Sequence, residues 1–93
     1  MTGKTIYSAE YRRLVERLRA RREEIGLTQT ALSKDLGWPQ QRLSAIEAGA
    51  RRLDVMEFLH LTARLGLAPD VALRLVVAAS ESPGRRKKAP DPK

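Results

Sequence analysis

Glycine and proline divide this chain into short segments, and their positions limit its fold more than any other sequence feature. Four glycines follow stretches whose apolar residues have helical spacing and two prolines open such stretches: Gly26, Gly37, Gly49, Gly66, Pro39 and Pro69. Glycine commonly ends a helix, and proline suits a first helical turn because its missing N–H would have no partner there. With no strand pattern and no internal repeat, the chain is predicted to be all-α.

Caps and apolar spacing together predict five helices. Their expected spans are residues 9–25, 29–36, 39–48, 55–65 and 69–80. Ser8, Thr28 and Asp54 are suitable N-caps, and Glu57 completes a capping box with Asp54. Apolar periodicity predicts that the following side chains face inward: Tyr11, Leu14, Val15, Leu18, Ile25, Leu32, Leu36, Trp38, Leu43, Ile46, Val55, Phe58, Leu59, Thr62 and Leu65.

Length and composition fit a single domain. The chain has 93 residues, enough for one modest helical core. We expect an N-terminal arm over 1–7, the domain over 8–80, and a basic disordered tail over 81–93, which is rich in proline and charge. The net charge is +7, of which residues 83–93 supply +4, so charge alone is a weak argument for a DNA partner.

The sequence argues against several classes of function. It has no cysteine and only one histidine, His60, so we expect no disulfide, no metal site and no cofactor. No serine or carboxylate is spaced to complete a catalytic set with His60, so an enzyme is not expected. Because no apolar run approaches about 18 residues and no secretory signal is apparent, we expect a cytoplasmic protein without a membrane segment.

A turn at Gly37-Trp38 joins two short predicted helices, the first of which carries the small residues Ala31 and Ser33. The motifs around this turn are EIGLTQTALSKDLG and WPQQRLSAIEAGARR, followed later by LTARLGLAPDVAL. Over residues 12–78 they resemble the XRE family, the lambda-repressor-like or Cro-like helix-turn-helix domains. The resemblance implies a five-helix DNA-binding fold, with the helix-turn-helix at helices two and three, and the function of a transcriptional regulator.

The resemblance also implies which residues read DNA bases. Glutamine offers a donor and an acceptor that match the major-groove edge of adenine, and the first turn of a recognition helix lies nearest the bases. The residues in these positions are Gln40, Gln41, Arg42, Ser44 and Ala45. The alternative is that the two glutamines are merely solvated helix formers. Ala45 departs from the longer polar residues of related repressors and would contact only a thymine methyl.

The family resemblance and, for Arg21, the basic end of the first helix suggest contacts to the DNA backbone. The candidates for phosphate contacts are Thr28, Gln29, Arg21, Arg51 and Arg52. The alternative for Arg51 and Arg52, in the loop after the third helix, is that they are solvated and contact no phosphate. Arg22 and Glu47 match a family ion pair that fixes the recognition helix, whereas two unrelated surface charges would contribute little.

The fifth predicted helix is apolar on nearly every side, so something beyond its own core should cover it. A second copy of the same helix would do so in a two-fold dimer through Leu73, Val76 and Val77. Alternatively, the first helix with Tyr7 and Tyr11 folds back over it. A dimer would place two recognition helices about 34 Å apart, which suits a palindromic operator.

The sequence therefore favours a repressor of the XRE type that binds double-stranded operator DNA as a homodimer. One alternative is the antitoxin of a toxin–antitoxin pair, which would bind its own promoter and a small protein partner. Another is a protein-interaction adaptor that has kept this fold and lost DNA binding. An RNA-binding protein is disfavoured because no aromatic platform accompanies the basic residues.

Overall fold

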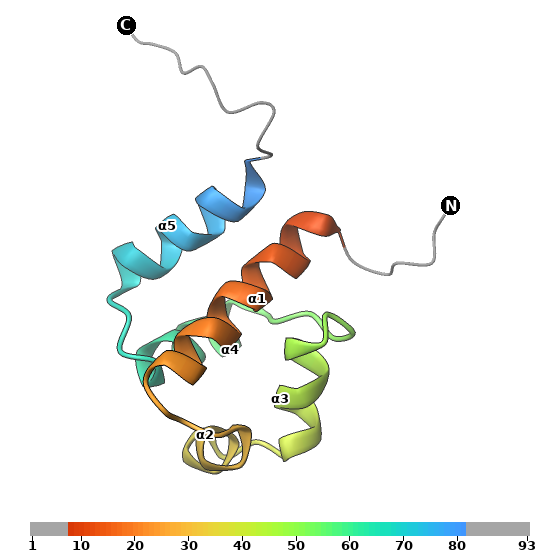
Figure 1. Ribbon diagram of the computed structural model, residues 1–93, viewed down its shortest axis with the longest axis vertical. Helices are drawn as coiled ribbons and strands as arrows, with labels where there is room; N and C mark the ends of the chain where they lie inside the picture. The colour runs from red at the N-terminus through yellow and green to blue at the C-terminus, as the bar shows by residue number, and fades with distance from the viewer. Residues whose placement is uncertain (1–7, 82–93) are drawn as a thin grey trace, which may run out of the picture.

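The computed structural model describes residues 8–81, which form five helices and contain no strand. The helices are α1 Ala9–Glu24, α2 Gln29–Leu36, α3 Gln40–Glu47, α4 Val55–Arg64 and α5 Pro69–Ser80. Helix α1 crosses the middle of the molecule with α5 beside it, and α2 and α3 lie toward the other end (Figure 1). The all-α, five-helix prediction is confirmed; the expected arm over 1–7 and nearly all of the expected tail lie outside the described residues.

Local capping explains where several of these helices begin. Ser8 Oγ accepts from Tyr11 N at 3.2 Å at the start of α1. At α4, Asp54 Oδ1 accepts from Glu57 N at 2.7 Å while Glu57 Oε1 accepts from Asp54 N at 3.0 Å, which is the predicted capping box. Pro39 precedes α3 as its N-cap and not as its first residue. The predicted and observed helix ends therefore differ by only one residue.

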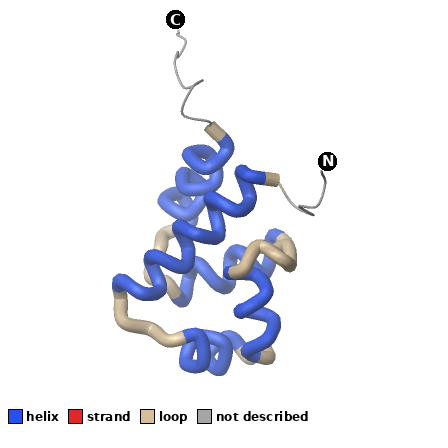
Figure 2. Tube along the Cα trace, turned by 45° about the vertical axis from the view of Figure 1, so that its right-hand side comes forward, coloured by secondary structure: helices blue, strands red, loops and turns tan. Residues whose placement is uncertain are grey.

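The turn between α2 and α3 depends on Gly37, whose φ is +76°. In this left-handed conformation Gly37 N donates to Lys34 O at 3.1 Å, and Trp38 N donates to Ser33 O at 2.9 Å. Side chains other than glycine rarely adopt such a φ without strain. The chain can consequently reverse within a few residues and start α3 directly after α2 (Figure 2).

All five helices contribute side chains to the core. Its buried apolar residues are Leu14, Val15, Leu18, Leu32, Leu43, Ile46, Leu61, Leu65, Ala72 and Ala79. Trp38 is only half-buried but packs against this cluster, as predicted. In the described part of the chain, no helix has both the length and the apolar character needed to span a bilayer.

The inner face of α4 differs from the prediction. Val55 is 80% exposed and Leu59 is 42% exposed, whereas Leu61 is buried at 2%. Phe58, Thr62 and Leu65 lie on the core side as predicted, whereas the packing of α4 on α2 and α5 also buries Leu61 and leaves Val55 and Leu59 outside. Ile25 was also expected inside, but it follows the last residue of α1 as its C-cap and is 42% exposed.

The three α5 residues that were expected at a dimer interface differ in their exposure. Val76 is half-buried and packs against the core of its own chain. Leu73 and Val77 remain exposed at 60% and 53%. Arg13 of α1 holds the end of α5, because its Nε and Nη2 donate to Ala79 O at 3.0 and 2.8 Å. The alternative was that the first helix, with Tyr7 and Tyr11, covers α5. Tyr11 packs against the core, and Tyr7 lies outside the described residues.

Candidate nucleic-acid interface

Helices α2 and α3 form a helix-turn-helix whose polar side chains reach the surface. Gln40, Gln41 and Ser44 are all exposed on α3, and Ala45 is half-buried. Neither α2 nor α3 has an acidic residue in its first turn. Both helix N-termini therefore keep the positive end of the helix dipole without local carboxylate compensation, which favours an approaching anion.

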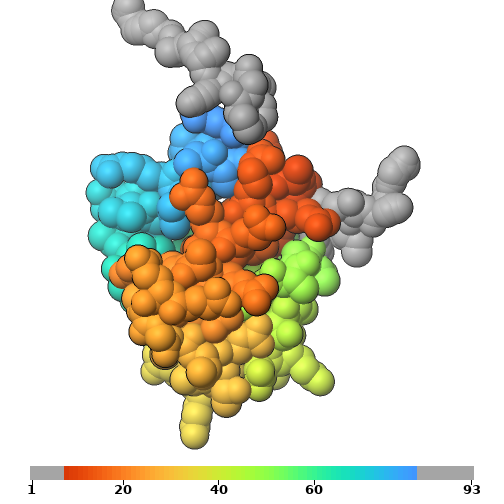
Figure 3. Space-filling view, viewed as in Figure 1, coloured from red at the N-terminus to blue at the C-terminus, as the bar shows by residue number. Residues whose placement is uncertain are grey.

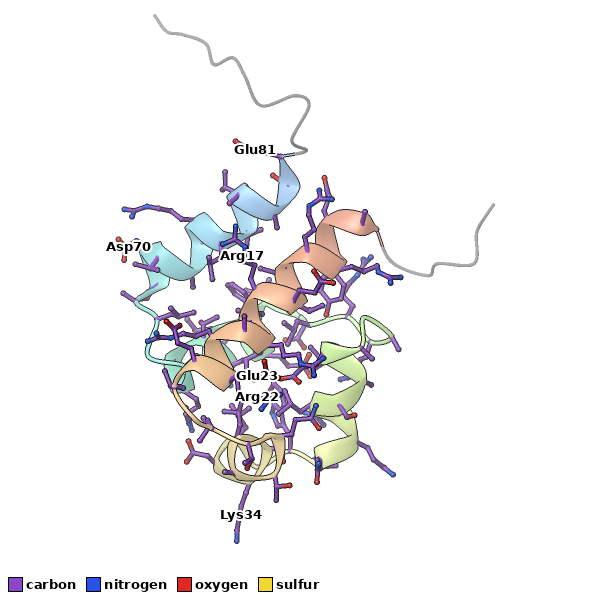
Figure 4. All side chains as sticks on the ribbon, in the orientation of Figure 1. Arg17, Arg22, Glu23, Lys34, Asp70 and Glu81 are labelled. Atoms are coloured by element: carbon purple, nitrogen blue, oxygen red, sulfur yellow. The ribbon has the colours of Figure 1, made fainter. Side chains whose placement is uncertain are left out.

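A buried ion pair joins α1 to the end of α3. Arg22 Nε donates to Glu47 Oε2 at 2.7 Å, and Arg22 Nη2 donates to Glu47 Oε1 at 3.0 Å. The two side chains are only 9% and 7% exposed, and Arg22 Nη1 also donates to Leu27 O at 2.8 Å. The hydrogen bonds from Arg22 to Glu47 raise the pKa of Arg22 above its ordinary value. Figure 4 shows Arg22 between α1 and the helix-turn-helix.

Gln29 extends this ion pair toward the recognition helix. Its Nε2 donates to Glu47 Oε1 at 2.8 Å, while its Oε1 lies 3.5 Å from Gln40 Nε2. Thr30 Oγ1 donates to Gln40 Oε1 at 3.2 Å. The first side chain of α3 is thus oriented by contacts from α2, and these contacts continue to the buried Arg22. Thr30 was not predicted as a site residue, because its ten-residue separation from Gln40 becomes a contact only when the turn forms.

The other predicted base-reading positions are less constrained. Within residues 8–81, the Gln41 side chain makes no hydrogen bond, and the Ser44 hydroxyl makes none either. Ala45 contributes its carbonyl to the following loop, where it accepts from Ala50 N at 2.9 Å and Arg51 N at 3.2 Å. Gln41 and Ser44 are available to an external partner without loss of an internal side-chain bond.

Arg42 turns toward α4. Its Nη1 lies 3.5 Å from Glu57 Oε2, and its guanidinium carbon lies 5.3 Å from the centre of the Trp38 ring, within cation–π range. Arg51 Nη2 lies 3.0 Å from the same Glu57 oxygen. Glu57 was predicted only as a capping residue, and nothing in the sequence pattern indicated that it would hold two candidate DNA contacts.

The loop after α3 is fastened to α1 by Tyr11. The Tyr11 hydroxyl donates to Arg51 O at 2.7 Å and accepts from Leu53 N at 2.9 Å. These two bonds hold the backbone on both sides of Arg52, whose side chain is exposed. The position of the loop arginines is therefore determined by α1 as well as by α3.

Two predicted phosphate contacts have structural roles. Thr28 Oγ1 caps α2 by accepting from Ala31 N at 3.0 Å. Arg21 Nε donates to Leu65 O at 2.9 Å, at the end of α4, and Arg21 Nη1 lies 3.3 Å from Glu24 Oε1. The Arg21 guanidinium therefore joins α1 to the end of α4. His60 is exposed, and the described residues contain no group of three His, Cys, Asp or Glu side chains that could hold a metal ion.

The family model described as a helix-turn-helix domain matches residues 13–75. The chain belongs to this helix-turn-helix family. The match runs from α1 into α5 and includes the Arg22–Glu47 pair, the turn at Gly37 and the loop arginines. A search of curated proteins found no match. Helix-turn-helix domains bind DNA through the second helix of the motif, so the membership identifies a DNA-binding domain and agrees with the resemblance.

Proposed function

We propose that this helix-turn-helix protein is a sequence-specific transcriptional regulator, a repressor, that places α3 in the major groove of double-stranded DNA. The observation that carries the proposal is the arrangement at the start of α3. Gln40 is oriented by Gln29 and Thr30, while the neighbouring Gln41 is exposed and makes no side-chain bond in the described chain. Orientation lowers the entropic cost of a contact, so Gln40 is suited to a bidentate contact with one adenine.

The proposed backbone contacts flank the recognition helix. Thr28 and Gln29 lie at the N-terminus of α2, where backbone N–H groups and the helix dipole can bind a phosphate. Arg51 and Arg52 lie in the loop that follows α3. Phosphate contacts on both sides of α3 would fix its register on the duplex, while Gln40, Gln41, Ser44 and Ala45 face the base edges. The first three helices form one continuous surface on one face of the molecule (Figure 3).

The proposed regulator acts as a homodimer on a palindromic operator. Leu73 and Val77 lie one helical turn apart on α5 and are both exposed, so they form an apolar stripe suited to a two-fold contact with a second copy. Two copies would present two recognition helices to one face of the DNA.

Selection of bound sequences from a random duplex pool tests this function. We expect enrichment of two half-sites in inverted orientation, each containing adenine, with centres separated by about one helical turn. Binding without any enriched sequence would reject base reading by α3. A single enriched half-site would reject the dimer and leave the recognition helix in place.

A further inference from the structure

Glu57 is an acidic residue among the arginines that follow the recognition helix. Its side chain is only 13% exposed. Arg42 of α3 and Arg51 of the loop both point to Glu57 Oε2, at 3.5 and 3.0 Å. One carboxylate therefore forms ion pairs with two arginines of the surface proposed to face DNA.

The capping role of Glu57 does not account for these contacts. The capping box uses Glu57 Oε1, which accepts from Asp54 N at 3.0 Å, and the arginines use the other oxygen. Arg51 makes this contact although its Nε is buried and has no hydrogen-bond partner in the described chain. Glu57 Oε2 thus holds the arginines independently of the start of α4.

The two arginines are not held equally. The Arg42 contact is longer by half an ångström, and Arg42 also lies over the Trp38 ring, which supports the guanidinium from the helix-turn-helix side. Arg51 has the shorter ion pair, and its backbone carbonyl is held by Tyr11. Of the two, Arg42 has the longer and therefore weaker ion pair with Glu57.

We propose that Glu57 is a specificity-determining residue that stands in for a DNA phosphate at Arg42. This inference rests on the proposed function. A phosphate must displace the carboxylate to gain Arg42, so each encounter with DNA lacks one charge contact until the exchange occurs. Since nonspecific binding comes almost wholly from phosphate contacts, Glu57 weakens it more than it weakens binding to an operator that α3 also reads.

The central test compares Glu57→Gln with Glu81→Gln. Both substitutions remove one negative charge, but Glu81 lies at the end of α5, at the opposite end of the molecule from Lys34 of α2 (Figure 4). The glutamine at position 57 keeps an oxygen for Asp54 N. On a random-sequence duplex over a salt series, we expect E57Q to bind roughly fivefold to tenfold tighter, with a log–log salt slope steeper by about 0.9, the value for one added phosphate contact. E81Q should stay within about twofold of the natural protein.

Two double variants assign the exchange to Arg42. The gain from E57Q should disappear in an R42A background and persist in an R51A background. Equal behaviour of E57Q and E81Q would overturn the inference, and loss of the gain with Arg51 instead of Arg42 would overturn the assignment. On the selected operator, E57Q should gain less than on random sequence, so the ratio of the two affinities should fall; an unchanged ratio would also contradict the inference.

A second measurement does not depend on whether E57Q folds. In the natural protein, the Nε–H resonances of Arg42 and Arg22 can be followed by NMR during titration with a duplex. The Arg42 signal should shift as it leaves Glu57, whereas that of Arg22, buried against Glu47, should not. A static Arg42 signal at saturating DNA would overturn the exchange. Failure of the natural protein to bind any duplex at low salt is a different result, since it would reject the proposed function itself.

Discussion

The hydroxyl of Tyr11 donates a 2.7 Å hydrogen bond to the carbonyl of Arg51, forty residues later in the chain. The same hydroxyl accepts from Leu53 N at 2.9 Å, so one side chain of α1 holds both ends of the short segment that carries Arg52. The loop proposed to grip the DNA backbone is consequently part of the folded framework.

Tyr11→Phe should therefore lower both stability and DNA affinity. Loss of the hydroxyl leaves Arg51 O and Leu53 N without this partner, which costs about 1–3 kcal/mol of unfolding free energy if both become unsatisfied. Affinity should fall by a similar factor on every sequence, because the loop positions the protein and does not read bases. Urea unfolding and binding to two unrelated duplexes measure these effects. Ser80→Ala, which removes an exposed hydroxyl bonded within α5, is the control and should change little.

Breaking the buried Arg22–Glu47 pair should be much more damaging. Glu47→Gln or Arg22→Met leaves one charge buried without its partner, at an expected cost of about 3–5 kcal/mol. The exposed pair Arg64–Asp35 is the control, and Asp35→Asn should cost about 0–1 kcal/mol. If Asp35→Asn lowers the free energy of unfolding as much as the buried-pair variants do in chemical denaturation, the pair at the end of α3 has no special structural importance.

The sign of the pH effect follows from the raised pKa of Arg22. A cation whose pKa is higher in the folded state stabilises that state at every pH below the pKa of the unfolded residue, and this stabilisation is lost only as the pH rises through the folded value. Since both values lie far above neutrality, the contribution of Arg22 should be constant from neutral to mildly alkaline pH. A drop in the natural protein's stability over that range, absent in Arg22→Met, would contradict this expectation.

Replacement of Gln40 and Gln41 by alanine should remove preference among DNA sequences while leaving weak, salt-sensitive binding. Thr30→Val is a finer test, because it removes the donor that orients Gln40 and leaves both glutamines in place. It should reduce discrimination between operator and random duplex by less than the double alanine variant does. A uniform loss on all sequences, in either variant, would argue that the glutamines do not contact bases.

Arg52→Ala should weaken binding equally on all sequences and flatten the log–log salt dependence by about 0.9 for each lost phosphate contact. A salt titration of the natural and variant proteins on one operator and one random duplex measures this slope. An unchanged slope would remove Arg52 from the backbone contacts.

Leu73→Glu should dissociate the proposed dimer, because it places a charge on the exposed stripe of α5. Val55→Glu is the matched control, since Val55 is equally apolar and even more exposed, but lies at the start of α4. Sedimentation at tens of micromolar should show a dimer for the natural protein and V55E, and a monomer for L73E. A monomeric natural protein would reject the interface, and dissociation by V55E alone would move it to α4.

Helix limits were predictable from the sequence because they depend on neighbours within a few residues. Ser8, Thr28 and Asp54 act on backbone groups three positions away, so their effect is visible without any tertiary contact. The Arg22–Glu47 contact was predicted from resemblance to a family and not from residue spacing, and the structure contains it.

The remaining contacts required the packed structure. Leu61 is buried while Val55 and Leu59 are exposed, because the contacts of α4 with α2 and α5 decide which of its apolar residues lie inside. The contact of Thr30 with Gln40 and the contacts of Glu57 with two arginines connect different elements. The spacing of residues in the sequence does not predict how such elements are placed relative to each other. Arg21 illustrates the same point, because its hydrogen bond to the carbonyl of Leu65, at the end of α4, could not be predicted from the spacing.

Gln40 is held by Gln29 and Thr30, whereas the Gln41 side chain is exposed, and this difference has an evolutionary consequence. A change at position 40 disturbs contacts that lead back to the core, whereas changes at 41 or 44 alter only the outer surface. Descendants of this regulator should therefore acquire new target sites mainly through residues 41 and 44, with position 40 changing only alongside its supports on the preceding helix.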